Sequence, residues 1–160
     1  MAGTVAIGIQ QFNEIRKKGY FYIDKTAFIR EWWEKGDSVT LITRPRRFGK
    51  TLTMSMVEQF FSVKYAGQHN LFEGLAIWET KAYREIQGTY PVISLSFANL
   101  KEPSYELTRQ KVCDQLQQLY TEHAYILESG ILKGADKSFF ERMLHNEKVE
   151  YVDATLALYK

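Results

Sequence analysis

The segment from Val39 to Ser55, VTLITRPRRFGKTLTMS, constrains the fold of this chain more than any other. It opens with a short run rich in β-branched residues, Val39 to Thr43, which predicts a buried strand. A basic loop, Arg44 to Phe48, follows directly. From about Gly49 to Tyr65 the apolar residues recur with the 3.6-residue period of an amphipathic helix. The segment therefore predicts a strand, a tight loop and a helix in succession.

Gly49, Lys50 and Thr51 stand where this loop meets the helix, and they match the end of the phosphate-loop pattern. Arg44 occupies the place of the first glycine, so the strict pattern is not met. The chemistry still suits a phosphate, because the helix N-terminus carries about half a positive charge and glycine lets the backbone approach closely. We expect Lys50 to contact the β- and γ-phosphates and Thr51 to place its hydroxyl on Mg²⁺. The amides expected to hold the α- and β-phosphates are those of Arg47, Phe48, Gly49, Lys50, Thr51 and Leu52.

The alternative is that the segment binds no phosphate and is an ordinary strand-to-helix turn with a solvated basic loop. We favour phosphate binding, because a β-branched run precedes the Gly-Lys-Thr motif and an amphipathic helix follows it. Arg44, Arg46 and Arg47 are weighed separately, since an arginine could contact phosphate or stabilise transition-state charge. For each of them taken singly, a solvated position or an ion pair elsewhere in the fold is slightly favoured.

The composition fits one globular domain of 160 residues, because 45% of them are hydrophobic and intrinsic disorder is thereby excluded. Cys113 is the one cysteine, which excludes a disulfide framework and a multi-cysteine zinc site, and we expect it to be buried in a core. The net charge is only +2, so the chain lacks a broad basic face for nucleic acid. No apolar run reaches the roughly 20 residues of a membrane span, and no signal peptide is evident. The sequence therefore predicts a cytoplasmic protein without membrane contact.

Apolar periodicity predicts further helices along the chain, and one further apolar run predicts a strand. The strand is Tyr90 to Phe97, YPVISLSF. The predicted helices lie at about 8–18, 24–36, 104–127, 136–144 and 149–159. Alternation of strands and helices predicts an α/β fold, although such a domain normally needs more than two strands.

Four segments of the sequence resemble the bacterial AAA-ATPase-like family. The loop segment ITRPRRFGKTLTMSM resembles the phosphate loop of that family, which accepts arginine in place of the first glycine. FYIDKTAFI (Phe21 to Ile29), LFEGLAIW (Leu71 to Trp78) and YPVISLSF resemble three further segments in the same order. The resemblance covers about the whole chain. It implies an ATP-binding P-loop NTPase with a three-layer α/β fold and the additional-strand arrangement of AAA and STAND ATPases. Residues 1–160 would form the N-terminal part of one such domain.

The resemblance also implies a position for the segment upstream of the loop. In related ATPases a segment just before the loop lies near the adenine, so Tyr22, Asp24 and Lys25 are further candidates for nucleotide contact. The alternative for Asp24 is to cap the following helix, and we favour that alternative. ATP and Mg²⁺ are the cofactors implied.

A second acidic strand is implied by the resemblance and is not evident in this sequence. Its Asp would hold Mg²⁺ and its Glu would orient the attacking water. We therefore expect a fragment truncated before that strand, which binds ATP and does not hydrolyse it alone. Without the intervening strands, Val39 to Thr43 and Tyr90 to Phe97 would share no sheet, so exposed sheet edges could self-associate. Nucleic-acid contact would need a C-terminal domain outside this chain.

Two other hypotheses stay open. A small P-loop kinase would need lid arginines after the second strand, and only Arg109 and Arg142 follow Phe97. A non-enzymatic module would use the arginine-rich loop to bind nucleic-acid phosphate or a protein partner, and its binding would be sensitive to salt. We favour nucleotide binding over both.

Overall fold

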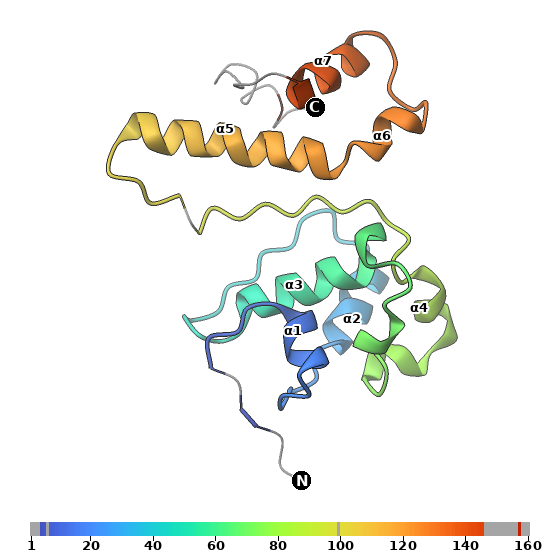
Figure 1. The fold of residues 1–160 in the computed structure, drawn as a ribbon. Coiled ribbons are helices and arrows are strands. Elements are labelled where there is room, and N and C mark those ends of the chain that lie inside the picture. The colour runs from blue at the N-terminus through green and yellow to red at the C-terminus, as the bar shows by residue number, and fades with distance from the viewer. Residues whose placement is uncertain (1–3, 6, 99, 146–156, 158–160) are drawn as a thin grey trace. The chain divides into compact units, whose positions relative to one another are not determined.

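The computed structural model describes residues 4–5, 7–98, 100–145 and 157, and in this part of the chain the regular structure is helical (Figure 1). Two compact units divide the chain, Met1–Val92 and Ile93–Lys160. In chain order, the elements are α1 (Phe12–Lys17), α2 (Ala27–Lys35), α3 (Lys50–Phe61), η1 (Val63–Tyr65), η2 (His69–Leu71), η3 (Ala76–Glu79), α4 (Lys81–Ile86), α5 (Tyr105–Glu122), α6 (Tyr125–Glu128) and α7 (Gly134–His145).

An aromatic core holds the first unit together. Phe12 of α1, Phe60 of α3 and Phe72 are fully buried, with ring centroids 5.2 Å apart between Phe12 and Phe72 and 5.1 Å apart between Phe60 and Phe72. Met56 lies one turn before Phe60 on the same face of α3 and is equally buried. Burial of each such side chain contributes about 1.5–3 kcal/mol. The helical period that predicted α3 therefore marks the face that joins it to α1.

Polar groups also join the start of α1 to the middle of α3. The hydroxyl of Ser55 accepts the backbone N–H of Phe12 at 3.1 Å and donates to the side-chain oxygen of Gln11 at 3.1 Å. The amide of Gln59 donates to Ser55 at 2.9 Å and to Gln11 at 3.3 Å. These bonds fix where the chain enters α1, and so they fix the segment that precedes it.

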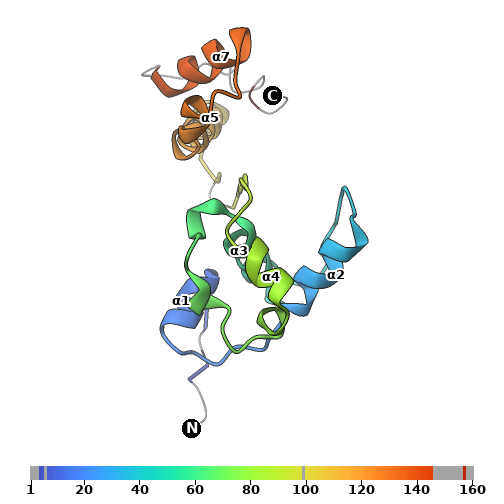
Figure 2. The same ribbon diagram turned by 90° about the vertical axis from the view of Figure 1, so that its right-hand side faces the viewer.

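The second unit is built on α5 and α7, which lie side by side in both views (Figure 2). Cys113 and Leu116 of α5 pack with Phe139 and Met143 of α7 in a separate core. The hydroxyl of Ser104 caps α5 by accepting the N–H of Leu107 at 3.2 Å. The prediction that Cys113 is buried is confirmed.

The prediction of a three-layer α/β P-loop fold is wrong. Within the described residues there is no strand, and the one bridge found there joins Ser62 to Tyr90. The predicted strand from Val39 to Thr43 is irregular, and the side chain of Val39 is 86% exposed. The predicted strand from Tyr90 to Phe97 is equally irregular beyond that bridge. A strand is stable only when a neighbour accepts its backbone hydrogen bonds, and among the described residues the pairing of either run is limited to the bridge at Tyr90.

The helix predictions fare better. The predicted helices at 8–18, 24–36, 49–65, 104–127 and 136–144 correspond to α1, α2, α3, α5 and α7, although α1 and α3 are shorter than expected. Gly36 ends α2 in the left-handed conformation, at φ 65°. The predicted helix at 149–159 lies outside the described residues except for Ala157. None of the described helices is both long and apolar enough to cross a membrane.

Candidate functional site

The basic loop turns into α3 through two residues with left-handed backbone. Arg47 has φ 68° and Gly49 has φ 75°, while Phe48 between them has negative φ. Glycine adopts this conformation freely, whereas for an arginine it costs about 1–2 kcal/mol of conformational free energy. Alternating handedness of this kind forms a concave nest of backbone amides. The amides from Arg47 to Leu52 donate to no other group in the described part of the chain.

Lys50, the first residue of α3, closes the loop on itself. Its ammonium donates to the backbone carbonyl oxygen of Arg44 and, at 3.3 Å, to that of Pro45. The side chain therefore spans the loop from the helix back to its start. Thr51, the next residue, is exposed at the surface.

A cleft of about 1200 Å³ lies along this loop in the first unit. It is lined by residues 5, 7–10, 21–23, 25 and 45–52, together with Ile15. Among the described residues, four cations line it, namely Lys25, Arg46, Arg47 and Lys50, and no acidic residue does. The cleft is therefore a concave surface with a concentration of uncompensated positive charge.

Most of the sequence-predicted candidates are brought together by this cleft. Its lining includes Tyr22, Lys25, Arg46, Arg47, Phe48, Gly49, Lys50, Thr51 and Leu52. Asp24 is not among the lining residues. The sequence predictions missed the apolar part of the wall, in which Val5, Ile7, Phe21 and Ile23 are exposed. Alternation of apolar residues in these two segments of the sequence was the available signal, since alternate positions of an extended chain would face the same side.

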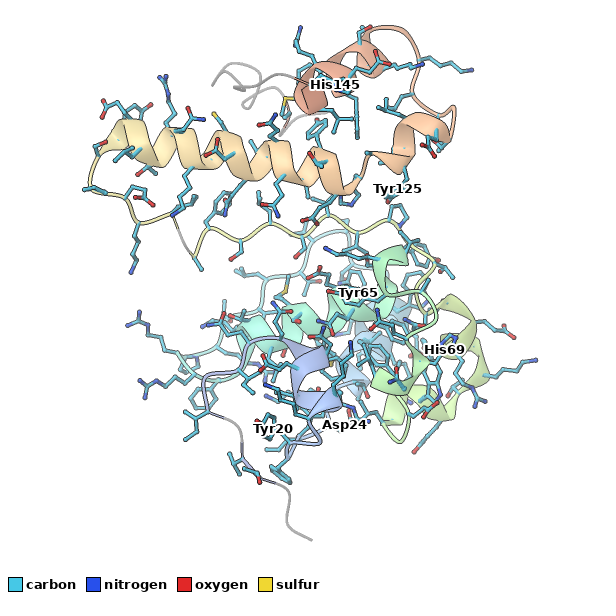
Figure 3. All side chains as sticks on the ribbon, in the orientation of Figure 1. Tyr20, Asp24, Tyr65, His69, Tyr125 and His145 are labelled. Carbon is cyan, nitrogen blue, oxygen red and sulfur yellow. The ribbon has the colours of Figure 1, made fainter. Side chains whose placement is uncertain are left out.

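Asp24, which is labelled in Figure 3, accepts hydrogen bonds from groups at the starts of two helices. Its Oδ1 accepts the backbone N–H of Thr26 at 2.8 Å and the Thr26 hydroxyl at 2.7 Å, just before α2 begins. Its Oδ2 accepts the N–H of Ala76, the first residue of η3, at 2.8 Å. Partial burial alone would raise the pKa of Asp24, but the hydrogen bonds from Ala76 and Thr26 outweigh it and hold the pKa below the usual value. This carboxylate ties α2 to η3.

Tyr22 lines the cleft while its side chain joins the core. Its ring packs edge-on against Phe12 with centroids 5.4 Å apart, and its hydroxyl donates to the sulfur of Met56 at 3.2 Å. Burial raises the pKa of Tyr22 to about 12. The side chain therefore anchors the segment that leads into Lys25.

Oxygen ligands for a metal ion are few at this site. Among the described residues, no three His, Cys, Asp or Glu side chains gather where they could hold a metal. Thr51 lines the cleft, and its hydroxyl is an oxygen ligand of the kind that Mg²⁺ takes.

Comparison with known proteins finds a family over most of the chain. Residues 6–157 match the family model described as Predicted AAA-ATPase. An uncharacterized protein in the vnfD 5' region of Azotobacter chroococcum mcd 1 is 38% identical over 92 residues. That match covers 57% of this chain and 16% of the relative, so the chain spans a small part of the relative's length. No solved structure matches.

Proposed function

This chain belongs to the family of predicted AAA-ATPases, and we propose that its loop from Pro45 to Leu52 is a variant phosphate loop that binds ATP with Mg²⁺. The observation that carries the proposal is the cleft, in which four cations and no acid surround a set of unbonded backbone amides. An anion of high charge density is the ligand that such a surface favours.

The electrostatic gain is large enough to decide the class of ligand. A pair of unit charges 4 Å apart contributes about 4 kcal/mol at the effective dielectric of a protein surface. Several cations acting together therefore favour a polyphosphate over a neutral or singly charged molecule. Amides at the start of α3 add the partial positive charge of the helix N-terminus.

The residues present fit a nucleotide. Gly49 carries no Cβ, so the backbone of the loop is open to close approach by a phosphate. Lys50 would exchange the carbonyl oxygens of Arg44 and Pro45 for phosphate oxygens, with the amides from Arg47 to Leu52 around them. The exposed apolar side chains of Ile7 and Phe21 offer a surface for the base.

Thr51 would hold the metal. We propose that its hydroxyl contacts a Mg²⁺ ion that arrives with the nucleotide and that, when bound, neutralises phosphate charge. No catalytic base is assigned to the described residues, so the proposed activity of this chain is binding. Because 92 residues match only 16% of the relative, we propose that residues 1–160 are the N-terminal portion of a longer cytoplasmic ATPase.

Self-association stays a prediction, and we now base it on exposed apolar segments in place of sheet edges. In these segments Leu41 is 82% exposed and Ile93 is 71% exposed. Sedimentation velocity over a series of protein concentrations would test this, and a single monomeric species throughout would refute it.

Calorimetric titration with Mg-ATP tests the proposal. Wild-type protein is compared with Lys50→Ala, and Lys35→Ala in the last turn of α2 is the control, because Lys35 is exposed and lies outside the cleft. We expect binding by wild type and the control, and at least a tenfold loss with Lys50→Ala, since a charged hydrogen bond contributes about 1.5–3 kcal/mol.

The opposite outcome is equally informative. No binding of Mg-ATP by the wild-type protein would overturn the proposal. Salt-sensitive binding of single-stranded polynucleotide, with no preference for free nucleotide, would instead support the module whose arginines hold nucleic-acid phosphate.

A further inference from the structure

A second lysine lies at the glycine of the loop. The ammonium of Lys25 is 3.2 Å from the position that a Cβ on Gly49 would occupy. Lys25 is half-buried, lines the same cleft and precedes α2, so it reaches the loop from a separate segment of the chain. Lys25 and Lys50 therefore both line the cleft along the loop.

Lys25 has no anionic partner in the described part of the chain. Its ammonium makes no hydrogen bond or ion pair with a described residue. The adjacent carboxylate, Asp24, is engaged by Thr26 and Ala76 instead. Among the described residues, the charged side chains that line the cleft with Lys25 are the cations Arg46, Arg47 and Lys50. An anion in the cleft would therefore meet a concentration of positive charge.

The backbone of Lys25 is held on both sides. Tyr22 is anchored in the core through Phe12 and Met56, and Thr26 is fully buried. The carbonyl oxygen of Lys25 itself accepts the N–H of Phe28 at 3.1 Å. The backbone from which this side chain extends is therefore set before any ligand binds, which lowers part of the entropic cost of using it.

We propose that Lys25 is a second phosphate-binding lysine of the nucleotide site. This rests on the proposed function of the loop, and it replaces the adenine contact that the sequence implied for Lys25. The ammonium groups of Lys25 and Lys50, whose residues line the same cleft, bind the polyphosphate, so the site discriminates by phosphate number. A triphosphate binds more tightly than a diphosphate, and a monophosphate binds weakly.

Titration of a ligand series separates phosphate contact from base contact. Adenosine, AMP, ADP and ATP, the last two with Mg²⁺, are titrated into wild type, Lys25→Gln, Lys25→Arg and the control Lys35→Gln. Lys25→Gln weakens ATP binding about 10- to 100-fold, leaves adenosine binding unchanged, and narrows the preference for ATP over AMP. Lys25→Arg keeps most of the ATP affinity, because the charge remains. Equal losses for adenosine and ATP would overturn the proposal in favour of a base contact, and no loss would overturn it outright.

A measurement on the unaltered protein covers the case in which Lys25→Gln does not fold. Lysines of the wild-type chain are acetylated in the presence of ATP, AMP or adenosine, and modification at Lys25 and Lys35 is quantified by mass spectrometry. Protection of Lys25 by ATP but not by adenosine supports the proposal, and unprotected Lys25 at saturating ATP refutes it.

The two proposals can fail separately. If wild type binds ATP and Lys50→Ala does not, while Lys25→Gln binds normally, the phosphate loop stands and Lys25 has no part in it. If wild type binds no nucleotide, both proposals fall.

Discussion

Gly49 shows how much of this site depends on a single residue. Its φ of 75° is left-handed, and the position of its missing Cβ lies beside the ammonium of Lys25. Glycine therefore does two things here, since it allows the turn into α3 and leaves the loop backbone uncovered. The Gly-Lys-Thr motif predicted the second role, and the structure adds the first.

Substitution of Gly49 by alanine should separate stability from binding. Left-handed backbone costs a residue with a Cβ about 1–2 kcal/mol, and the end of a lysine side chain can move away from a new methyl group. We therefore expect Gly49→Ala to lower the free energy of unfolding by that amount, measured with urea, and to weaken ATP binding more than tenfold. Gly74→Ala is the matched control, because Gly74 has φ 76° and nothing lies within 4 Å of its Cβ position. A similar loss of ATP affinity in both variants would contradict this role for Gly49.

The residue types at the site were predictable from sequence, and their geometry was only partly so. Gly49, Lys50 and Thr51 follow from a local pattern of three consecutive residues. The left-handed Arg47 was not predictable, because arginine seldom adopts that conformation. Proximity of Lys25 to Gly49 depends on how two segments fold against each other, and no local pattern encodes it.

At the scale of elements, Asp24 joins α2 to η3 through hydrogen bonds that require its charged form. Because these bonds hold its folded pKa below the unfolded value of about 3.9, the carboxylate stabilises the fold above that value. The contribution is then lost as the pH falls through the folded pKa.

Asp24→Asn should therefore destabilise the protein in a pH-dependent way. We expect a loss of about 1–3 kcal/mol at pH 7, because the amide replaces a charged acceptor of three hydrogen bonds. The difference in free energy of unfolding between Asp24→Asn and wild type should shrink below pH 4. Urea unfolding at several pH values measures it, with Asp37→Asn as control, since Asp37 is exposed in the segment after α2. A difference that stays constant down to pH 2 would rule out this role.

Helices and strands differed in how well sequence predicted them. The stop at Gly36 and the cap at Ser104 are local signals, and both mark real helix ends. The β-branched run from Val39 to Thr43 has strand propensity, but that propensity reports fit to a neighbouring strand. Pairing is non-local, and among the described residues this run forms no strand.

On the scale of the whole molecule, the described residues form two cores. The first is centred on Phe60 and its aromatic neighbours, and the second on Leu116 between α5 and α7. The cleft is lined wholly by residues of the first unit. We therefore expect that destabilising the second core leaves the proposed binding of ATP in the cleft unchanged.

Leu116→Ala tests that separation. Removing a leucine that is 2% exposed should destabilise the second unit by about 2–5 kcal/mol. Hydrogen exchange should then quicken in α5 and α7, while α3 and the affinity for ATP stay unchanged. Phe60→Ala is the counterpart, and it should quicken exchange in α3 and abolish binding. Loss of ATP binding in Leu116→Ala would show that the site depends on the second unit.

The ammonium of Lys50 already contacts the carbonyl oxygens of Arg44 and Pro45 in the unliganded loop. These oxygens would compete with a phosphate for the same ammonium. If the proposed phosphate takes the place of those oxygens, its measured dissociation constant would exceed the intrinsic one by the inverse of the fraction of open loops. That factor would be the same for every ligand of the loop, so the contact would lower all affinities without changing their order.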